Sequence, residues 1–198
     1  MIGISDDTAT DHLIAVVGRE AVEAALSATG HHDPGLNRPL LTTRELFQLK
    51  LGDPDRIGRY RRADETERRR ILDELSTEPL PELAASSFTE PNAIDVEWLA
   101  ITGDLCRVIT WLDARSDDQP ELVEALTAGR GPIDRRAWPV VAFKGGSEPG
   151  VLSLTWLAAD PDGRKVVVAG IANDPDSTID VDRATAVAQR AFELLATG

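Results

Sequence analysis

The sequence has little of several features that would place it in a specialised class of protein. Its one cysteine, Cys106, excludes a disulfide within the chain. No run approaches the roughly 20 consecutive apolar residues that a membrane-spanning helix needs. The first seven residues, MIGISDD, also lack the basic and then apolar order of a secretory signal. As written, the sequence therefore predicts a cytoplasmic protein with no membrane anchor.

Positive charge is also in short supply. The chain has 21 Lys and Arg against 34 Asp and Glu, so its net charge is -13 and its isoelectric point is near 4.6. Such a field repels phosphate backbones and anionic lipid surfaces, which argues against nucleic acid and membranes as partners. One basic run, residues 60–70, goes against this trend. Its acids recur at helical spacing and favour a solvated helix with local ion pairs.

What is present is an ordinary globular composition, 42% hydrophobic and 28% charged, in a chain whose length suits one domain. Residues 1–137 show mainly helical periodicity, with Asp7 or Thr8 available to cap the first helix. A capping box is predicted at Thr42 and Glu45, which are three residues apart. Helices are expected over residues 7–29 with a break at Gly18, and over 42–52, 64–75, 93–100, 103–114 and 120–129.

The pattern changes at Trp138. Residues 138–146, 151–159 and 165–173 predict three strands, and the turns between them are too short to hold crossover helices, so the sheet should be an antiparallel meander. Residues 179–198 predict an amphipathic helix. The expected fold class is α+β in a single domain, residues 1–198, with a helical region followed by a three-stranded antiparallel sheet and a C-terminal helix.

Two short motifs, far apart in the sequence, suggest chemistry. Ser5-Asp6-Asp7 opens the first helix, and Lys144-Gly145-Gly146-Ser147 ends the first strand. In this order and with their flanks, they resemble the Ser-Asp-Asn and Lys-Thr-Gly motifs of class A β-lactamases and penicillin-binding proteins, which are serine hydrolases. Residues 41–50 resemble the Thr-Thr segment after the Ω-loop of that family. The resemblance covers all but the middle third of the chain and implies the β-lactamase/transpeptidase-like fold.

The resemblance also implies a role for each residue of the two motifs. Ser5 would pass a proton between a base and the leaving nitrogen, and Lys144 would bind the substrate carboxylate beside it. Gly145 and Gly146 would let a ligand lie against the strand, and the N–H of Ser147 would be an oxyanion donor. Gly145 replaces the family's Thr, which removes a hydroxyl but keeps the backbone contacts.

Two positions depart further from the family pattern. Asp7 stands where the family has an Asn that donates a hydrogen bond to the substrate, and an ionised carboxylate can only accept one. Residues 33–37, DPGLN, resemble the Glu-Pro-x-Leu-Asn of the family's Ω-loop and make Asp33 the candidate deacylating base. An Asp-Pro-Gly sequence, however, is more often simply a turn.

The nucleophile has no candidate in the sequence. In the family it lies in a Ser-x-x-Lys motif, and no serine of this chain has a lysine three residues later. We therefore expect the chain to be the C-terminal two-thirds of a longer hydrolase, inactive alone, whose complete form could be exported. Removal of an N-terminal segment would also bare the apolar strand over residues 166–171, which predicts self-association.

The substrates implied by the resemblance are β-lactams, D-alanyl peptides or related esters, with no cofactor and no metal. His31 and His32 are not predicted to bind a metal, because adjacent side chains diverge and partners at ligand spacing are missing. Other functions remain open: a non-catalytic protein of the same fold that binds cell-wall peptides or β-lactams, a decayed remnant, or a helical interaction protein in which packing covers Lys144. Taken alone, Ser5-Asp6-Asp7 is more typical of a helix cap, and Lys144-Gly145-Gly146 of a turn.

Overall fold

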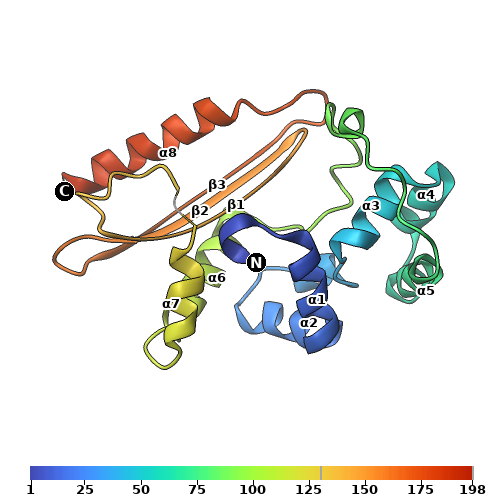
Figure 1. Cartoon of the computed structure of the whole chain (residues 1–198), viewed down its shortest axis with the longest axis horizontal. Coiled ribbons are helices and arrows are strands. Elements are labelled where there is room, and N and C mark those ends of the chain that lie inside the picture. The colour runs from blue at the N-terminus through green and yellow to red at the C-terminus, as the bar shows by residue number, and fades with distance from the viewer. Residues whose placement is uncertain (130, 198) are drawn as a thin grey trace.

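The structure is a computed structural model that describes residues 1–129 and 131–197. It shows a group of helices beside an antiparallel sheet, with α6 and α7 on one face of the sheet and α8 on the other (Figure 1). The predicted α+β class is confirmed. No helix within the described ranges is long and apolar enough to cross a membrane.

The chain begins with a short turn of helix, η1 (Ile2–Ile4), followed by α1 (Asp7–Val17) and α2 (Arg19–Ala28). Gly18 separates α1 from α2 at φ 92°, a conformation that favours glycine, so the predicted break is confirmed. The cap of α1 is Asp6 rather than Asp7 or Thr8, because the Asp6 carboxylate accepts the N–H of Ala9 at 2.7 Å.

A second group of helices packs around its own core. It consists of α3 (Thr43–Leu51), α4 (Pro54–Arg62) and α5 (Glu65–Ser76). The buried hydrophobic side chains of this core are Leu41, Leu46, Leu49, Ile57, Tyr60, Ile71, Leu72, Leu75 and Val96. The capping box of Thr42 and Glu45 is present as predicted.

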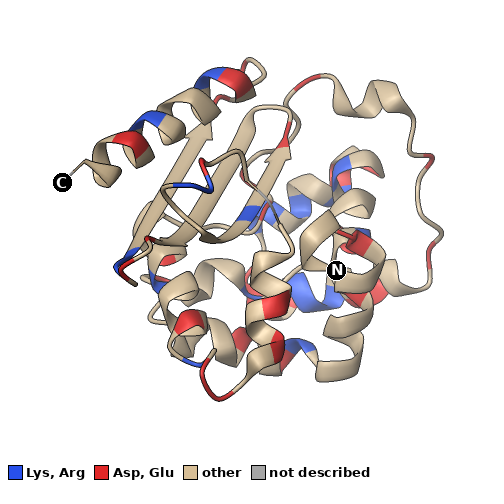
Figure 2. Ribbon diagram, turned by 60° about the vertical axis from the view of Figure 1, so that its left-hand side comes forward, with Lys and Arg blue, Asp and Glu red and all other residues tan. Residues whose placement is uncertain are grey.

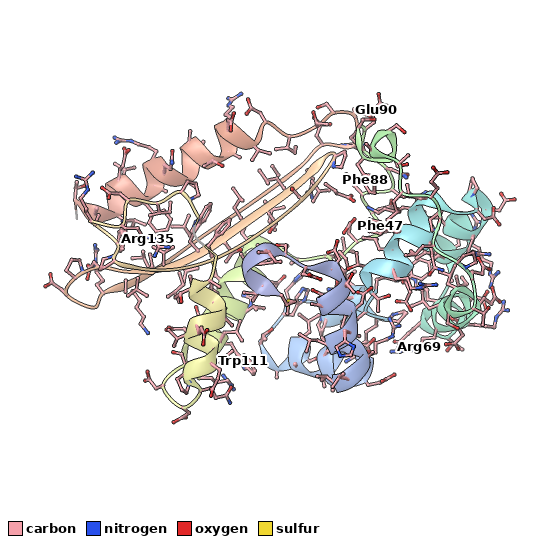
Figure 3. All side chains as sticks on the ribbon, in the orientation of Figure 1. Phe47, Arg69, Phe88, Glu90, Trp111 and Arg135 are labelled. Carbon is pink, nitrogen blue, oxygen red and sulfur yellow. The ribbon has the colours of Figure 1, made fainter. Side chains whose placement is uncertain are left out.

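The basic run over residues 60–70 is divided between two helices rather than forming one. The chain turns at Ala63 and Asp64, and ion pairs then join α4 to α5, as between Arg59 and Glu67 at 2.7 Å. Figure 3 shows Arg69 on α5, whose guanidinium pairs with Glu23 of α2 at 2.8 Å. This pair explains why the acidic Glu23 is buried on α2, a position that hydrophobic periodicity does not predict.

The segment over residues 93–100 is not the predicted helix. It is irregular, and Asn37 fastens it by two hydrogen bonds of 2.8 Å to the backbone of Leu99. Trp98 is 44% exposed, and its indole N–H donates to the carbonyl of Leu41. Side-chain bonds to a distant loop thus override the local helical pattern. The neighbouring elements are η2 (Pro34–Asn37), η3 (Ala85–Phe88), α6 (Thr102–Asp113) and α7 (Pro120–Thr127).

The sheet is the predicted antiparallel meander of β1 (Val140–Glu148), β2 (Val151–Ala159) and β3 (Lys165–Asn173), in the order β1-β2-β3. The first strand runs through the two glycines of its motif, so that Lys144 lies opposite Thr155 in the middle of β1. Figure 2 shows that charged residues lie mainly on the helices and loops and are sparse on the strands.

The two faces of the sheet carry separate cores. On one face, Trp138 and Trp156 pack edge to face against Phe192 of α8 (Val181–Ala196). On the other face, Ala142 and Leu157 pack against Ile109 of α6. The predicted C-terminal helix is therefore confirmed, but its buried side chains are Ala188 and Phe192, whereas Val187 and Leu194, which fit an inward stripe, are exposed.

Candidate functional site

Ser5 and Lys144, 139 residues apart in the chain, meet in the structure. The ammonium Nζ of Lys144 donates a hydrogen bond to Ser5 Oγ at 2.8 Å. The expected proximity of the two motifs is thus confirmed, and the N-terminal turn lies beside the middle of β1 (Figure 1). The helix α7 holds this arrangement, because it packs against both η1 and β1. A side chain at Gly3 would place its Cβ only 2.9 Å from that of Ala128, so η1 approaches the end of α7 closely.

Ser5 adopts an unusual backbone conformation. Its φ and ψ are 51° and 54°, the left-handed region that non-glycine residues seldom occupy. The turn is held by Asp6, whose N–H donates to the carbonyl of Met1 and whose carboxylate caps α1. Ser5 is exposed, so its hydroxyl is open to solvent on the side away from Lys144. Such conformations cost free energy and are concentrated at functional sites.

Lys144 is half-buried, and its environment favours the neutral amine more than water does. Burial lowers the pKa of its ammonium group, and the nearby carboxylate of Asp7 opposes this effect. Lys144 Nζ also donates to the carbonyl oxygen of Gly145. The amine is therefore oriented by two neighbours, one of them the Ser5 hydroxyl.

The glycines after Lys144 differ in their surroundings. A Cβ at Gly145 would lie 3.0 Å from the ring of Phe143, so aromatic packing occupies the place of the family's Thr side chain. Gly146 lies on the same face of the strand as Lys144, since side chains alternate along β1. A Cβ at Gly146 would meet nothing within 4 Å, and both Gly146 and Ser147 are exposed. A ligand bound beside Lys144 therefore has room to lie along β1.

A second lysine joins the helical region to β1 through ion pairs. Lys50 of α3, whose side chain is 5% exposed, pairs with Glu148 at 2.7 Å and with Glu97. Burial raises the pKa of Glu148 to about 7, and the charge of Glu97 adds to this rise while Lys50 opposes it. Glu148 lies four residues beyond Lys144 on the same face of the strand. Sequence reasoning missed this cluster, because no motif links three residues so distant in the chain.

Asp33 makes a hydrogen bond within its own loop. Its carboxylate accepts the N–H of Gly35 at 3.1 Å at the start of η2, which is the local turn that an Asp-Pro-Gly sequence favours. Among the described residues, no hydrogen bond joins Asp33 to Ser5 or Lys144. Its role as a base stays a prediction.

His31 and His32 do not diverge as expected. Their rings stack with centroids 5.1 Å apart, and both face the fully buried carboxylate of Asp104. Burial disfavours the charged form of Asp104, but backbone hydrogen bonds from Ile101 and His32 and side-chain bonds from Arg107 and His32 outweigh it and lower its pKa.

These three side chains lie close enough together to hold a metal ion. They are, however, already engaged. His31 uses both ring nitrogens, one with the N–H of Asp33 and one with the carbonyl of Leu99, and Asp104 accepts a hydrogen bond from Arg107. An ion would have to displace these partners, so the geometry gives the cluster a structural role at the start of α6.

A cavity lies elsewhere among the described residues. It has a volume of about 220 Å³ between the DPGLN loop and α4, and its walls include Leu36, Tyr60, Arg68 and Trp98. Neither Ser5 nor Lys144 lines it. Ser5, Gly146 and Ser147 are exposed, so the pair of motifs presents an open surface along β1.

Comparison with known proteins gives the family of the chain. A sequence profile described as the Beta-lactamase enzyme family matches residues 1–110, more than half of the 198 residues. The α+β fold and the family match define a β-lactamase-like serine hydrolase. The chain belongs to the β-lactamase enzyme family. No curated protein matches the sequence. The matched range contains Ser5, Asp7 and Asp33, and Lys144 lies beyond it.

Proposed function

We propose that the surface formed by Ser5, Lys144 and the following glycines recognises the carboxylate of a β-lactam or a D-alanyl peptide. In acyl-serine hydrolysis of such a substrate, Ser5 would relay a proton to the leaving nitrogen. The observation that carries this proposal is the hydrogen bond of 2.8 Å between Lys144 Nζ and Ser5 Oγ. This bond places the Lys144 ammonium against the Ser5 hydroxyl, which can relay a proton. Both lie at the edge strand β1, beside the open space at Gly146.

The binding mode follows from the donors present. A ligand carboxylate would accept hydrogen bonds from the Lys144 ammonium and the Ser5 hydroxyl, and charge-assisted bonds of this kind are the stronger ones. The ligand backbone would extend over Gly146 along β1. Every second N–H of this edge strand points away from β2 and has no strand partner among the described residues, so these groups can pair with the ligand. Asp7 limits the site, because it can only accept hydrogen bonds.

The serine nucleophile of the family is not among these residues, since no serine has a lysine three positions later. A complete β-lactam hydrolase would therefore need a nucleophile from outside the 198 residues. The same observation favours a second function from another class, a protein of this fold that binds β-lactams or cell-wall peptides without turning them over. A β-lactam incubated with this chain should leave no acyl group on the protein in either case.

The first test is binding of N-acetyl-D-alanyl-D-alanine, followed by the amide resonances of the chain in two-dimensional NMR. We expect shifts at Ser5 and at Gly145 to Ser147. Lys144→Ala should weaken binding roughly tenfold or more, because a charge-assisted hydrogen bond contributes about 1.5–3 kcal/mol. The matched control is Lys165→Ala on β3, whose ammonium pairs with Asp113. Equal affinity in Lys144→Ala, or equal binding of the C-terminal carboxamide of the peptide, would contradict the proposal.

A further inference from the structure

We propose that Ser5 is itself an acylatable nucleophile with Lys144 as its base, and that it reacts with small uncharged activated esters. This inference rests on the proposed function, because it assigns the same two side chains a second kind of reaction. It requires a hydroxyl that is exposed to the ester, a neutral amine within hydrogen-bond distance, and a place for the developing oxyanion.

The hydroxyl meets the first requirement. Ser5 is exposed, and its left-handed backbone at φ 51° places it at the tip of the turn between η1 and α1. Its Oγ is 2.8 Å from Lys144 Nζ, which is the distance of a nucleophile from its base in serine–lysine pairs. In the neutral state, Lys144 can accept the Ser5 proton while it continues to donate to the carbonyl of Gly145.

The surroundings of Lys144 favour the second requirement, a neutral amine, without fixing its protonation state. Half-burial disfavours its charged form, and Asp7 is the carboxylate that opposes this effect at the amine. The other acidic cluster of the strand, around Glu148, is neutralised in part by Lys50. For the third requirement, the outward N–H groups of edge strand β1 after Lys144 are available to the oxyanion.

The reaction can be written with its atoms balanced. A bond forms between Ser5 Oγ and the carbonyl carbon of the ester, and the Ser5 proton passes to the neutral Lys144 Nζ. The bond from the carbonyl carbon to the aryloxy oxygen breaks, and the aryloxide leaves with the electron pair. Lys144 then releases its proton to water. The product is an ester on Ser5, and the labelling experiment below detects it.

Ser5 and Lys144 cannot bind a carboxylate and act as nucleophile and base at the same time. A bound carboxylate stabilises the charged form of Lys144 and so removes the base that Ser5 needs. A carboxylate ligand should therefore protect Ser5 from acylation, both by occupying the surface and by keeping Lys144 protonated. An uncharged ester leaves the amine available. This is the physical reason for restricting the proposal to uncharged substrates.

The test treats the chain with p-nitrophenyl acetate and locates the acetyl groups by peptide mass spectrometry, which separates Ser5 from lysine side chains. We expect an acetyl group on Ser5 that is absent from the Ser5→Ala variant. The control variant is Ser86→Ala, which replaces an exposed serine of η3 and should leave the labelling of Ser5 unchanged. Lys144→Arg should retain binding of N-acetyl-D-alanyl-D-alanine but reduce Ser5 acetylation roughly 100-fold, because a guanidinium does not lose its proton in proteins. Saturating amounts of that peptide should slow acetylation of the unaltered chain.

Acetylation confined to lysines, or a Lys144→Arg variant that acetylates Ser5 at the normal rate, would overturn the inference. So would undiminished labelling of Ser5 in the presence of bound peptide. Circular dichroism of each variant shows whether it is folded, and Ser5→Thr provides a second hydroxyl-bearing variant that should retain part of the labelling. Failure of peptide binding with normal Ser5 labelling would instead contradict the proposed function and leave this inference standing.

Discussion

At the scale of single residues, Glu148 is the titratable group that links the sheet to the helical region, through its ion pair with Lys50 of α3. Its pKa is raised to about 7, mainly by burial. A carboxyl whose pKa is higher in the folded chain than in the unfolded chain binds more protons when folded. Between about pH 4.5 and pH 7, the free energy of unfolding should therefore fall as pH rises, by about 1–3 kcal/mol.

Glu148→Gln should remove this part of the pH dependence, because an amide does not titrate. The free energy of unfolding of the variant, minus that of the unaltered chain, should be larger at pH 8 than at pH 5. Urea unfolding at the two pH values measures this difference. Glu193→Gln, in an exposed pair with Arg190, is the matched control and should leave the pH dependence unchanged. The same pH slope in Glu148→Gln and the unaltered chain would show that Glu148 titrates normally.

At the scale of elements, α3 connects the two regions. It carries Lys50 at its C-terminal end. Gln48 from the same helix donates to the carbonyl of Leu75 in the last turn of α5 and to that of Glu78 after α5. Phe47 of α3 packs edge to face against Phe88 of η3 at 5.6 Å (Figure 3). The N-terminal end of α3 is held by the capping box and by Arg19, which pairs with Glu45 at 2.6 Å.

Thr42→Ala should test the contribution of this cap. The hydroxyl of Thr42 accepts the N–H of Glu45 at 3.2 Å, and the substitution leaves that group without its partner. We expect a loss of about 1 kcal/mol in the free energy of unfolding, as for other helix caps. Thr66→Ala, at an exposed position of α5, should cost less than half as much. Equal losses in the two variants would mean that the cap of α3 contributes nothing specific.

At the scale of the whole molecule, the arrangement leaves apolar surface uncovered. Ile4, Val16 and Val17 are 81%, 68% and 57% exposed, and no residue of α1 is buried. The strand β3 is only half-buried along most of its length and, among the described residues, pairs with β2 alone. Exposed apolar patches and unpaired strand edges both favour association.

We therefore expect the chain to associate as its concentration rises, seen by sedimentation velocity, and to bind a dye that reports apolar surface. Val16→Lys combined with Val17→Lys should shift the equilibrium toward monomer. Ala24→Lys, on an exposed position of α2, should have a smaller effect. A monomer at all concentrations, with a sharp and reversible melt above about 60 °C, would show that these surfaces do not drive association.

Local signals predicted the elements well where the cause of the structure is local. The break at Gly18, the capping box of Thr42 and Glu45, and the three strands follow from backbone freedom, short-range hydrogen bonds and alternation. The same signals failed over residues 93–100, where Asn37 holds the backbone of Leu99 from another part of the chain. They also do not show that Phe192 of α8 packs against Trp138 and Trp156, because these contacts join distant parts of the chain.

The sequence by itself determined the order of helices and strands, the family motifs and the sign of the net charge, since each of these depends on neighbouring residues or on composition. Only the tertiary structure decided which distant side chains meet. It placed Ser5 against Lys144, assembled Lys50 with Glu148, and left Asp33 in a turn of its own. The physical reason is that hydrogen bonds and ion pairs act over a few ångströms in space, whereas these partners lie about 100 residues or more apart in the chain.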